Sequence, residues 1–417
     1  MTADTRTRVG EELEQRVLPW WQEHGVDHEY GGVLTGFDNA GRRLTTDKYT
    51  WSQGRWAWLC ARIATDARAG LLRQDPQEWA GYARSTAEFV ARHSVLPGDV
   101  TAHLVTRSGE PMRVGENGEV SVSVLTDLFA ALGLAGASGL PDLDAGTARE
   151  WQETARRLLV HGTRRLLAHT APSEPYPVPP GYTDLAGIML RLHVAAELYR
   201  VDGRDDTARI ALAAAADLVA GDRPMWRADD WWEFRPDRVE DADTLLGRHR
   251  TPGHLLETVW MLSDAAQHVP GIESLVPDWL PDLAHHALAL GWDEEPGGVL
   301  RYVDRDGGRP TGPHHDDRYE TLVLETWDTK LWWVQVEALL ASVRLDRAYP
   351  DSGFDVWTAR LTDYTLATFP DPDGAEWLQV RDRAGRPLDR VVALPVKDPF
   401  HIARALLLAL ETENGAR

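Results

Sequence analysis

Residues 28–44 read HEYGGVLTGFDNAGRRL, and residues 294–309 read EEPGGVLRYVDRDGGR. Both stretches contain E-x-G-G-V-L, then three residues, an aspartate, two further residues and a glycine. The two phrases lie 266 positions apart, counted from Gly31 to Gly297. In each, β-forming residues flank a turn where glycine can supply a positive φ, so each predicts a β-hairpin. A phrase of this length that occurs twice indicates an internal repeat.

Weaker copies of the hairpin pattern occur at LVTRSGEPM (104–112) and EWLQVRDRAGRP (376–387). The turn residues of the four copies are separated by 70, 196 and 79 positions, in the order Asp38, Ser108, Asp304 and Arg383. The long middle gap leaves room for two more units. The Pro-rich stretch 172–181 and the stretch WWEFRPDRVEDAD (231–243) lie where those units belong. Six units of about 70 residues fit the 417-residue chain, although a chance match of common glycine turns is the alternative.

Between the hairpins the apolar residues recur with the helical period, and Thr50 and Pro76 stand where helices should begin. A parallel α/β fold is not expected, because no β-branched strands precede the helices. Two helices per unit predict an all-α fold, an (α/α)6 barrel with short β-hairpins at one rim, as a single domain over residues 1–417. The twelve expected helices cover residues 9–23, 49–64, 76–93, 120–135, 148–168, 186–201, 205–219, 252–269, 280–290, 322–344, 356–368 and 399–410.

Composition and charge exclude several classes of partner. The formal net charge is −21, which argues against nucleic acid because phosphates require a basic face. The N-terminal sequence MTADTRTRVGEELEQ has no apolar core of a signal peptide, and no apolar run is long enough to cross a membrane. Cys60 is the single cysteine, so neither a disulfide nor a cysteine zinc site is expected. The cytoplasm is the expected location. A homodimer is compatible with the sequence, which does not specify the oligomeric state.

Two predicted helix starts carry histidines. In TPGHLLETVWML (251–262), His254 and Glu257 share one helix face and Trp260 lies a further turn along, so Glu257 could orient the imidazole. In VKDPFHIARALLLAL (396–410), His401 lies in the first turn with Arg404 on the same face. The alternatives are a helix-surface ion pair at the first site and a core or capping histidine at the second.

Tryptophans beside charged or amide side chains form a third candidate site. Most of the 18 tryptophans are expected to fill the core, but Trp51 in WSQGR and Trp333 in WDTKLWWVQVEAL could stack on a sugar ring. Lys330 and Glu337 lie one helical turn before and after Trp333. Such a combination suits a polyhydroxylated ligand. The run HHDD (314–317) resembles a set of metal ligands, but in a Gly/Pro loop it is usually solvated, so no metal is expected. No nucleotide-binding or nucleophile motif is present, and no cofactor is expected.

Taken together, these stretches resemble the N-acylglucosamine 2-epimerase superfamily. The resemblance runs over most of the chain in the order WWQEH…DHEYGG, DKYTWSQGR, TPGHLLETVW, KLWWVQVEAL and FHIARALLLA. It implies an (α/α)6 barrel and a cofactor-free sugar 2-epimerase or aldose–ketose isomerase. It also implies that His254 and His401 are the acid–base pair acting at C2 of a ring-opened sugar.

The resemblance also implies roles for other residues. Glu257 is expected to orient His254, and Arg55 to stabilise an enediolate oxyanion. Trp333, Glu337 and Lys330 are expected to hold the sugar, while the WSQGR and KLWW stretches are closer to the N-acylglucosamine branch. His193, in MLRLHVAAELY, falls where the cellobiose-epimerase and mannose-isomerase branches carry a pocket histidine.

The sequence is therefore compatible with four functions. The first is a 2-epimerase of the N-acyl-D-glucosamine type. The second is a D-mannose isomerase or a cellobiose or mannose 2-epimerase using the same site. The third is a glycoside hydrolase or lyase, which requires two pocket carboxylates; Asp184 or Glu337 could supply one, but no obvious pair is visible. The fourth is a non-catalytic carbohydrate-binding protein, which would not require the two histidines.

Overall fold

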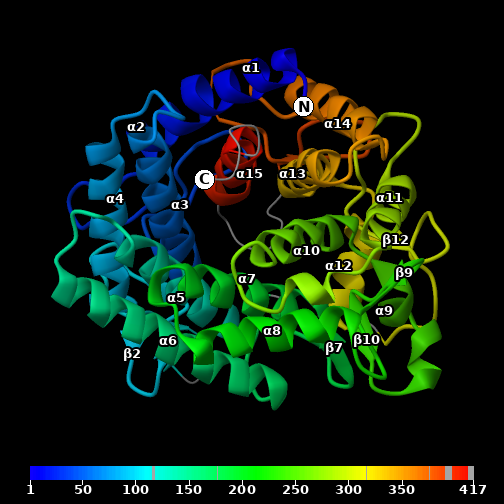
Figure 1. The fold of residues 1–417 in the computed structure, drawn as a ribbon, viewed down its shortest axis with the longest axis horizontal. Coiled ribbons are helices and arrows are strands. Elements are labelled where there is room, and N and C mark those ends of the chain that lie inside the picture. The colour runs from blue at the N-terminus through cyan, green and yellow to red at the C-terminus, as the bar shows by residue number, and fades with distance from the viewer. Residues whose placement is uncertain (115–117, 176, 316, 375, 390–396, 412–417) are drawn as a thin grey trace.

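The central feature of the fold is a closed ring of helices that are buried on nearly every side (Figure 1). The computed structural model describes residues 1–114, 118–175, 177–315, 317–374, 376–389 and 397–411. Apolar and small residues occupy all faces of these inner helices, as expected for a helix that packs against neighbours all round. Each helix contacts the next, and the last closes the ring against the first. In order, the inner helices are α3 (Thr50–Arg68), α5 (Val124–Ser138), α7 (Leu185–Asp202), α10 (Pro252–Ala265), α13 (Trp332–Ala348) and α15 (Pro399–Glu411).

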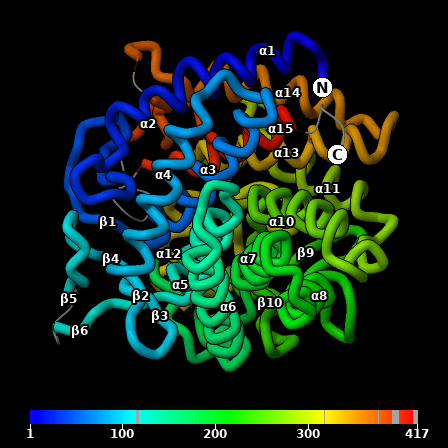
Figure 2. The backbone as a smooth tube through the Cα atoms, turned by 60° about the vertical axis from the view of Figure 1, so that its left-hand side comes forward, coloured from blue at the N-terminus to red at the C-terminus, as the bar shows by residue number. Residues whose placement is uncertain are grey.

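A second layer of helices covers this ring, and each outer helix buries only one face. In the outer helix α6, for example, Trp151, Ala155, Leu158 and Leu159 form a single apolar stripe at helical spacing. Figure 2 shows α4, α6 and α8 covering the near side of the inner helices. The outer helices are α1 (Ala3–Glu12) and α2 (Leu18–His24), α4 (Pro76–Phe89), α6 (Ala145–Leu167), α8 (Asp205–Val219), α11 (Leu280–Gly291) and α14 (Phe354–Thr368).

Inner and outer helices alternate along the chain, so the predicted (α/α)6 barrel is confirmed. The connecting segments contain short helical pieces of their own. These are η1 (Leu13–Val17), η2 (Val90–Ser94), η3 (Val239–Asp243), α9 (Leu245–Arg248), η4 (Glu273–Leu275) and α12 (Arg318–Thr326). No described helix is both long and apolar enough to span a lipid bilayer.

Short antiparallel strand pairs gather at one rim of the barrel. Four pairs include a strand that leads into an inner helix, so they fix where those helices begin. These pairs are β1 (Lys48–Tyr49) with β4 (Leu104–Val105), β7 (Tyr182–Asp184) with β10 (Phe234–Pro236), β11 (His249–Arg250) with β12 (Val303–Asp304), and β13 (Lys330–Leu331) with β14 (Val380–Arg381). The other pairs are local hairpins: β2 (Val95–Leu96) with β3 (Val100–Thr101), β5 (Arg113–Val114) with β6 (Glu119–Val120), and β8 (Trp226–Arg227) with β9 (Asp230–Trp231).

The first GGVL phrase is held by a buried lysine. The Nζ atom of Lys48 lies 2.9 Å from Asp27 Oδ2 and donates to the carbonyl of Gly31 at 2.7 Å. Arg107 donates to both carboxylate oxygens of Asp27, at 2.8 and 3.0 Å. The side chain of Gln53 hydrogen-bonds both backbone groups of the phrase's valine, at 2.7 and 2.8 Å. We call Asp27, Lys48 and Arg107 the first lysine cluster.

The second GGVL phrase is held in the same way, which explains the repetition. Lys330 Nζ lies 3.4 Å from Asp293 Oδ2 and donates to the carbonyl of Gly297. Arg383 donates to both oxygens of Asp293 at 2.7 and 3.0 Å, and Gln335 bonds both backbone groups of the valine, each at 2.8 Å. We call Asp293, Lys330 and Arg383 the second lysine cluster. The paired glycines of both phrases have φ between +77° and +81°, a conformation that other residues rarely adopt.

The prediction of one helix over residues 322–344 is wrong. The chain leaves α12 after Thr326, forms β13, and begins α13 at Trp332. The hydroxyl of Thr326 donates back to the carbonyl of Leu322 at 2.6 Å, and that of Thr329 donates to the carbonyl of Thr326 at 2.7 Å. Side-chain bonds of this kind compete with the helical ladder, and the pairing of β13 with β14 completes the break.

Candidate active site

A cavity of about 430 Å³ opens at the strand-bearing rim, where the inner helices begin. Every inner helix contributes to its wall with residues of its first turns. The side chains from the six helices are Trp51 and Arg55, Leu125 and Phe129, Ala186, Met189 and Leu190, His254 and Glu257, Trp332 and Trp333, and His401. Six of the residues predicted from the sequence therefore line this cavity: Trp51, Arg55, His254, Glu257, Trp333 and His401.

The two predicted histidines approach a single indole ring. The ring centroid of Trp333 lies 4.9 Å from that of His254 and 5.8 Å from that of His401. His254 comes from the first turn of α10 and His401 from the first turn of α15. Residues 147 positions apart in the sequence thus face the same cavity.

The carboxylate that orients His254 is Glu233, and the prediction of Glu257 for this role is wrong. Glu233 Oε1 lies 2.7 Å from His254 Nδ1. Burial disfavours the charged imidazole, but the adjacent carboxylate outweighs that effect and raises the pKa of His254. Glu233 lies in the segment between β9 and β10, 21 positions before the histidine, so helical spacing could not reveal the contact.

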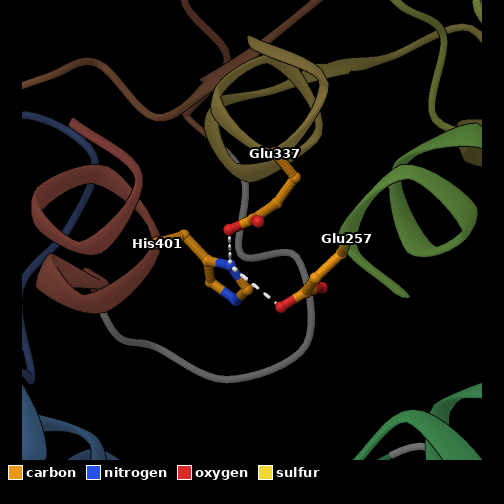
Figure 3. A group of neighbouring side chains, drawn as sticks. All are labelled: Glu257, Glu337 and His401. Atoms are coloured by element: carbon orange, nitrogen blue, oxygen red, sulfur yellow. Dashed lines mark hydrogen bonds and ion pairs between the residues drawn. The ribbon is translucent and has the colours of Figure 1, made fainter. Parts of the chain in front are cut away.

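Glu257 belongs instead to a buried cluster around His401 (Figure 3). Glu337 Oε1 lies 2.8 Å from His401 Nδ1, and Glu257 Oε1 lies 3.8 Å from the same nitrogen. Arg404 Nη2 donates to Glu257 at 2.5 Å and to Glu337 at 2.7 Å. Trp260 Nε1 donates to Glu337 Oε2 at 2.7 Å. We call Glu257, Glu337, His401 and Arg404 the Arg404 cluster.

These contacts change the predicted roles of three residues. Glu337, Arg404 and Trp260 were expected to bind substrate, but all three are buried behind His401 and none lines the cavity. Burial opposes the charge on Glu337, yet Arg404 and His401 outweigh it and lower the pKa of that carboxyl to about 2. Glu337 and Arg404 therefore contact Nδ1 of His401, at 2.8 and 3.2 Å, and Trp260 holds Glu337 in place.

The three acidic and imidazole groups of the Arg404 cluster also resemble a metal-binding set. Their ligand atoms lie within 4.8 Å of one another. The guanidinium of Arg404 already supplies the positive charge at this place, which does not suit the cluster to a metal ion. In the run HHDD, Asp317 caps α12 by accepting from the backbone of Tyr319 at 2.7 Å, and Asp316 lies outside the described residues.

Arg55 presents its guanidinium to the cavity from an aromatic clamp. The guanidinium carbon lies 4.0 Å from the ring centroid of Phe129, 4.7 Å from that of Trp51 and 5.2 Å from that of Phe400. Asp398 Oδ1 lies 3.7 Å from Nη1 of Arg55. Burial is the main cause of the lowered pKa of Arg55, and the nearby carboxylate of Asp398 opposes that effect. A guanidinium keeps its charge in proteins. The arginine is therefore a fixed positive charge at the cavity wall.

His193 and Lys330 do not line the cavity. His193 is buried between the indoles of Trp58 and Trp260, with centroid distances of 5.9 and 5.7 Å. Burial lowers its pKa to about 4, so the imidazole is neutral at pH 7. Lys330 is fully buried in the second lysine cluster. Their placement supports structural roles for both residues instead of the predicted contacts with substrate.

Several lining residues were not identified from the sequence. Arg301 and Tyr302 follow the second GGVL phrase directly, which is the signal that could have indicated them. Glu233 and Phe234 belong to the stretch WWEFRP, whose position was marked by the repeat but whose side chains were not considered. Tyr319, in the first turn of α12, had no sequence signal.

Comparisons with known proteins agree with this architecture. Residues 204–405 match the family model described as N-acylglucosamine 2-epimerase (GlcNAc 2-epimerase). N-acylglucosamine 2-epimerase of Homo sapiens is 28% identical over an alignment that covers 97% of this chain and 89% of the relative. The enzyme of Mus musculus is 27% identical, with coverage of 97% and 90%.

A crystal structure of a sugar epimerase from a ruminal bacterium has the same fold. The TM-score is 0.77 at 16% identity, and the superposition covers 99% of this chain and 100% of the other. The region matched by the family model includes His254 and His401, and the curated relatives align over nearly the whole chain. On these grounds the chain is similar, over nearly its whole length, to proteins of the N-acylglucosamine 2-epimerase superfamily.

Proposed function

We propose that this protein is a cofactor-independent sugar 2-epimerase, most like an N-acyl-D-glucosamine 2-epimerase. His254 and His401 would exchange the proton at C2 of a ring-opened aldose. The observation that carries the proposal is that both imidazoles lie within 6 Å of the indole of Trp333 and line one cavity. Each imidazole also has its own carboxylate partner.

The chemistry requires one proton carrier on each face of C2. Opening of the sugar ring converts C1 into a carbonyl, which makes the C2 proton acidic. One base removes this proton to form an enediolate, and a second group returns a proton to the opposite face. In both histidines Nδ1 is engaged by a carboxylate, at 2.7 Å in His254 and 2.8 Å in His401. The Nε2 atoms are therefore the ones available for proton transfer.

The negative charge of the enediolate needs a fixed positive partner. Arg55 lines the cavity and is immobilised by its aromatic clamp. A preorganised donor of this kind can contribute about 3 kcal/mol to transition-state stabilisation. The inner helices direct their amino-terminal ends toward the same cavity, and their dipoles favour negative charge there.

An apolar wall favours an N-acyl substituent over a bare hydroxyl. Leu125, Phe129, Met189, Leu190 and Phe234 line the cavity together. A methyl or longer acyl group gains free energy from such a surface, whereas a hydroxyl loses hydration there. His193, which the resemblance associates with cellobiose epimerases and mannose isomerases, does not reach the cavity. Both observations support the N-acylhexosamine class.

The carboxylates that line the cavity beside His254 are engaged by protein groups, which weakens the hydrolase alternative. Asp184 and Glu233 both line the wall. Asp184 caps α7 by accepting from the backbone of Gly187 at 2.9 Å, and Glu233 holds His254. Glu257 is paired with Arg404, so the proposed epimerisation, which uses the two histidines, accounts for these contacts better than hydrolysis does.

Proton exchange in D2O tests the proposal. N-acetylglucosamine or N-acetylmannosamine is incubated with the enzyme, and C2 is followed by NMR. The expected result is deuterium at C2 of the inverted product, with at least a roughly 100-fold slower epimerisation in His254→Asn and in His401→Asn. His169→Asn, at an exposed histidine, is the matched control. Full activity in either cavity variant would refute its role. A ketose product would indicate an isomerase, and release of a smaller sugar without exchange would indicate a hydrolase.

Cytoplasmic location and homodimerisation stay predictions from the sequence.

A further inference from the structure

Glu233 is a buried carboxylate whose place in the cavity wall is fixed by its backbone. Its carbonyl accepts a hydrogen bond from the backbone of Leu185 at 2.9 Å, and the next residue, Phe234, pairs with Asp184 across β7 and β10. The residue is 1% exposed and lines the cavity beside His254. The chain thus brings a charged group from an irregular segment to the start of two inner helices.

The two carboxylate oxygens of Glu233 have different surroundings. Oε1 accepts from His254, whereas Oε2 is buried and has no hydrogen-bond partner among the described residues. Glu337 is the carboxylate partner of His401. Its Oε1 contacts His401 and accepts from Arg404, and its Oε2 accepts from Trp260. A buried carboxylate oxygen without a donor is costly, so a donor is expected to reach it when the cavity is filled.

The charges that face His254 come from three elements. Glu233 touches it from the β9–β10 segment, Glu257 faces it from its own helix, and Asp184 faces it from β7. The charge of Glu257 is matched by Arg404. Asp184 is engaged as the cap of α7. Glu233 is therefore the carboxylate in direct contact that acts on the charge of His254.

We propose that Glu233 has two roles in the suggested epimerisation: Oε1 keeps His254 oriented and favours its imidazolium form in the free enzyme, while Oε2 accepts a hydrogen bond from a hydroxyl group of the bound sugar. The proposal rests on the proposed function for the identity of the ligand, an N-acylhexosamine. His254 is then the proton donor when His401 removes the C2 proton, and Glu233 links the charge of His254 to the presence of substrate. Glu337 cannot have the second role, because its oxygens are already satisfied inside the protein.

The first role is tested by titration of His254 in the ligand-free enzyme. The imidazole Cε1–H signal is followed by NMR against pH in the wild type, Glu233→Gln and the control Glu240→Gln. Glu240 lies seven positions further on with an exposed side chain. Removal of the Glu233 charge is expected to lower the midpoint by about 1–2 pH units, whereas the control keeps the wild-type midpoint. An unchanged midpoint in folded Glu233→Gln would overturn this role.

The second role is tested by binding of N-acetylglucosamine and its monodeoxy analogues. In the wild type, one analogue is expected to bind roughly tenfold more weakly than the parent sugar, because it lacks the donor to Oε2. In Glu233→Ala, which removes both oxygens, that analogue and the parent should bind within about twofold of each other, as expected once the acceptor is gone. Equal affinities in the wild type, a tenfold difference that persists in Glu233→Ala, or no binding at all would each overturn the contact. Thermal unfolding checks that both variants fold.

These outcomes are separable from those of the proposed function. The titration needs neither sugar nor turnover, so it can succeed when no C2 exchange is found. Conversely, C2 exchange in the wild type together with an unchanged titration midpoint of His254 in Glu233→Gln would support the epimerase activity and overturn the role of Glu233. The rate of C2 exchange in Glu233→Asp adds a further check, since the retained charge should restore part of the activity lost in Glu233→Gln.

Discussion

Replacement of Lys330 by methionine separates a structural role of this lysine from substrate binding. In the structure its Nζ atom donates to the carbonyl of Gly297 and pairs with Asp293 at 3.4 Å, away from the cavity. Removing one partner of a buried ion pair costs about 3–5 kcal/mol. Asp293 keeps its two bonds from Arg383, at 2.7 and 3.0 Å, so the lower limit applies. We therefore expect a loss of about 3 kcal/mol of unfolding free energy in Lys330→Met.

For 417 residues, an unfolding entropy of about 2.1 cal/mol/K per residue converts this loss into a fall in Tm of about 3–4 °C. Calorimetry or a thermal melt measures the fall, and the C2-exchange assay measures KM. Lys48→Met is the matched variant in the first lysine cluster and should lower Tm by a similar amount. The two clusters lie in separate segments, so the double variant should lose roughly the sum. A raised KM with an unchanged Tm in Lys330→Met would refute the structural role and restore Lys330 as a substrate-binding residue.

Three further predictions concern the cavity and its supports. Dialysis against EDTA should leave C2 exchange unchanged, because Arg404 supplies the positive charge among the acidic groups of its cluster; a loss that added metal restores would contradict this. Glu337→Gln should slow exchange roughly 100-fold. Folding lowers the pKa of Glu337 from 4.5 to about 2, so the stability that its charge contributes is full above pH 4.5 and is lost as the pH falls toward 2. Glu337→Gln lacks this contribution, so its Tm should fall less than that of the wild type between pH 4.5 and pH 2. Asn39→Ala should raise KM and lower stability by about 1–3 kcal/mol, because it breaks bonds to the backbone of Val380 and Leu388 that join two rim hairpins; unchanged melts and kinetics would contradict it.

The sequence predicted the features that depend on local patterns. Apolar periodicity identified the inner and outer helices, and the repeated GGVL phrase indicated two similar rim structures. Prediction failed where a side-chain contact or strand pairing overrides periodicity. Residues 322–344 have the helical pattern, but Lys330 and Leu331 pair with β14, 50 residues later. No single-sequence pattern encodes a pairing over that distance.

The sequence identified many of the residues that line the cavity, but it did not identify which side chains contact one another there. His254 and Glu257 have the spacing of an interacting pair on one helix face, yet Glu257 accepts a hydrogen bond from Arg404, and His254 contacts Glu233. Helical spacing restricts which residues can meet but does not decide among competing partners from other helices. The pairing of β7 with β10 brings Glu233 to the histidine, and this pairing depends on segments more than 40 residues apart.

The barrel explains why residues from both ends of the chain can act on one carbon atom. Each inner helix supplies only one to three cavity residues, all from its first turns, so the geometry of the site depends on where six helices begin. Those starting points are held by strand pairs and, at two of them, by the buried lysine clusters. A small displacement of the start of α3 or α13 would move Arg55 or Trp333 relative to the two histidines without altering any of these side chains. Rim residues that never touch the sugar should therefore affect kcat through geometry, and a variant such as Lys48→Met should slow exchange without shifting the titration midpoint of His254.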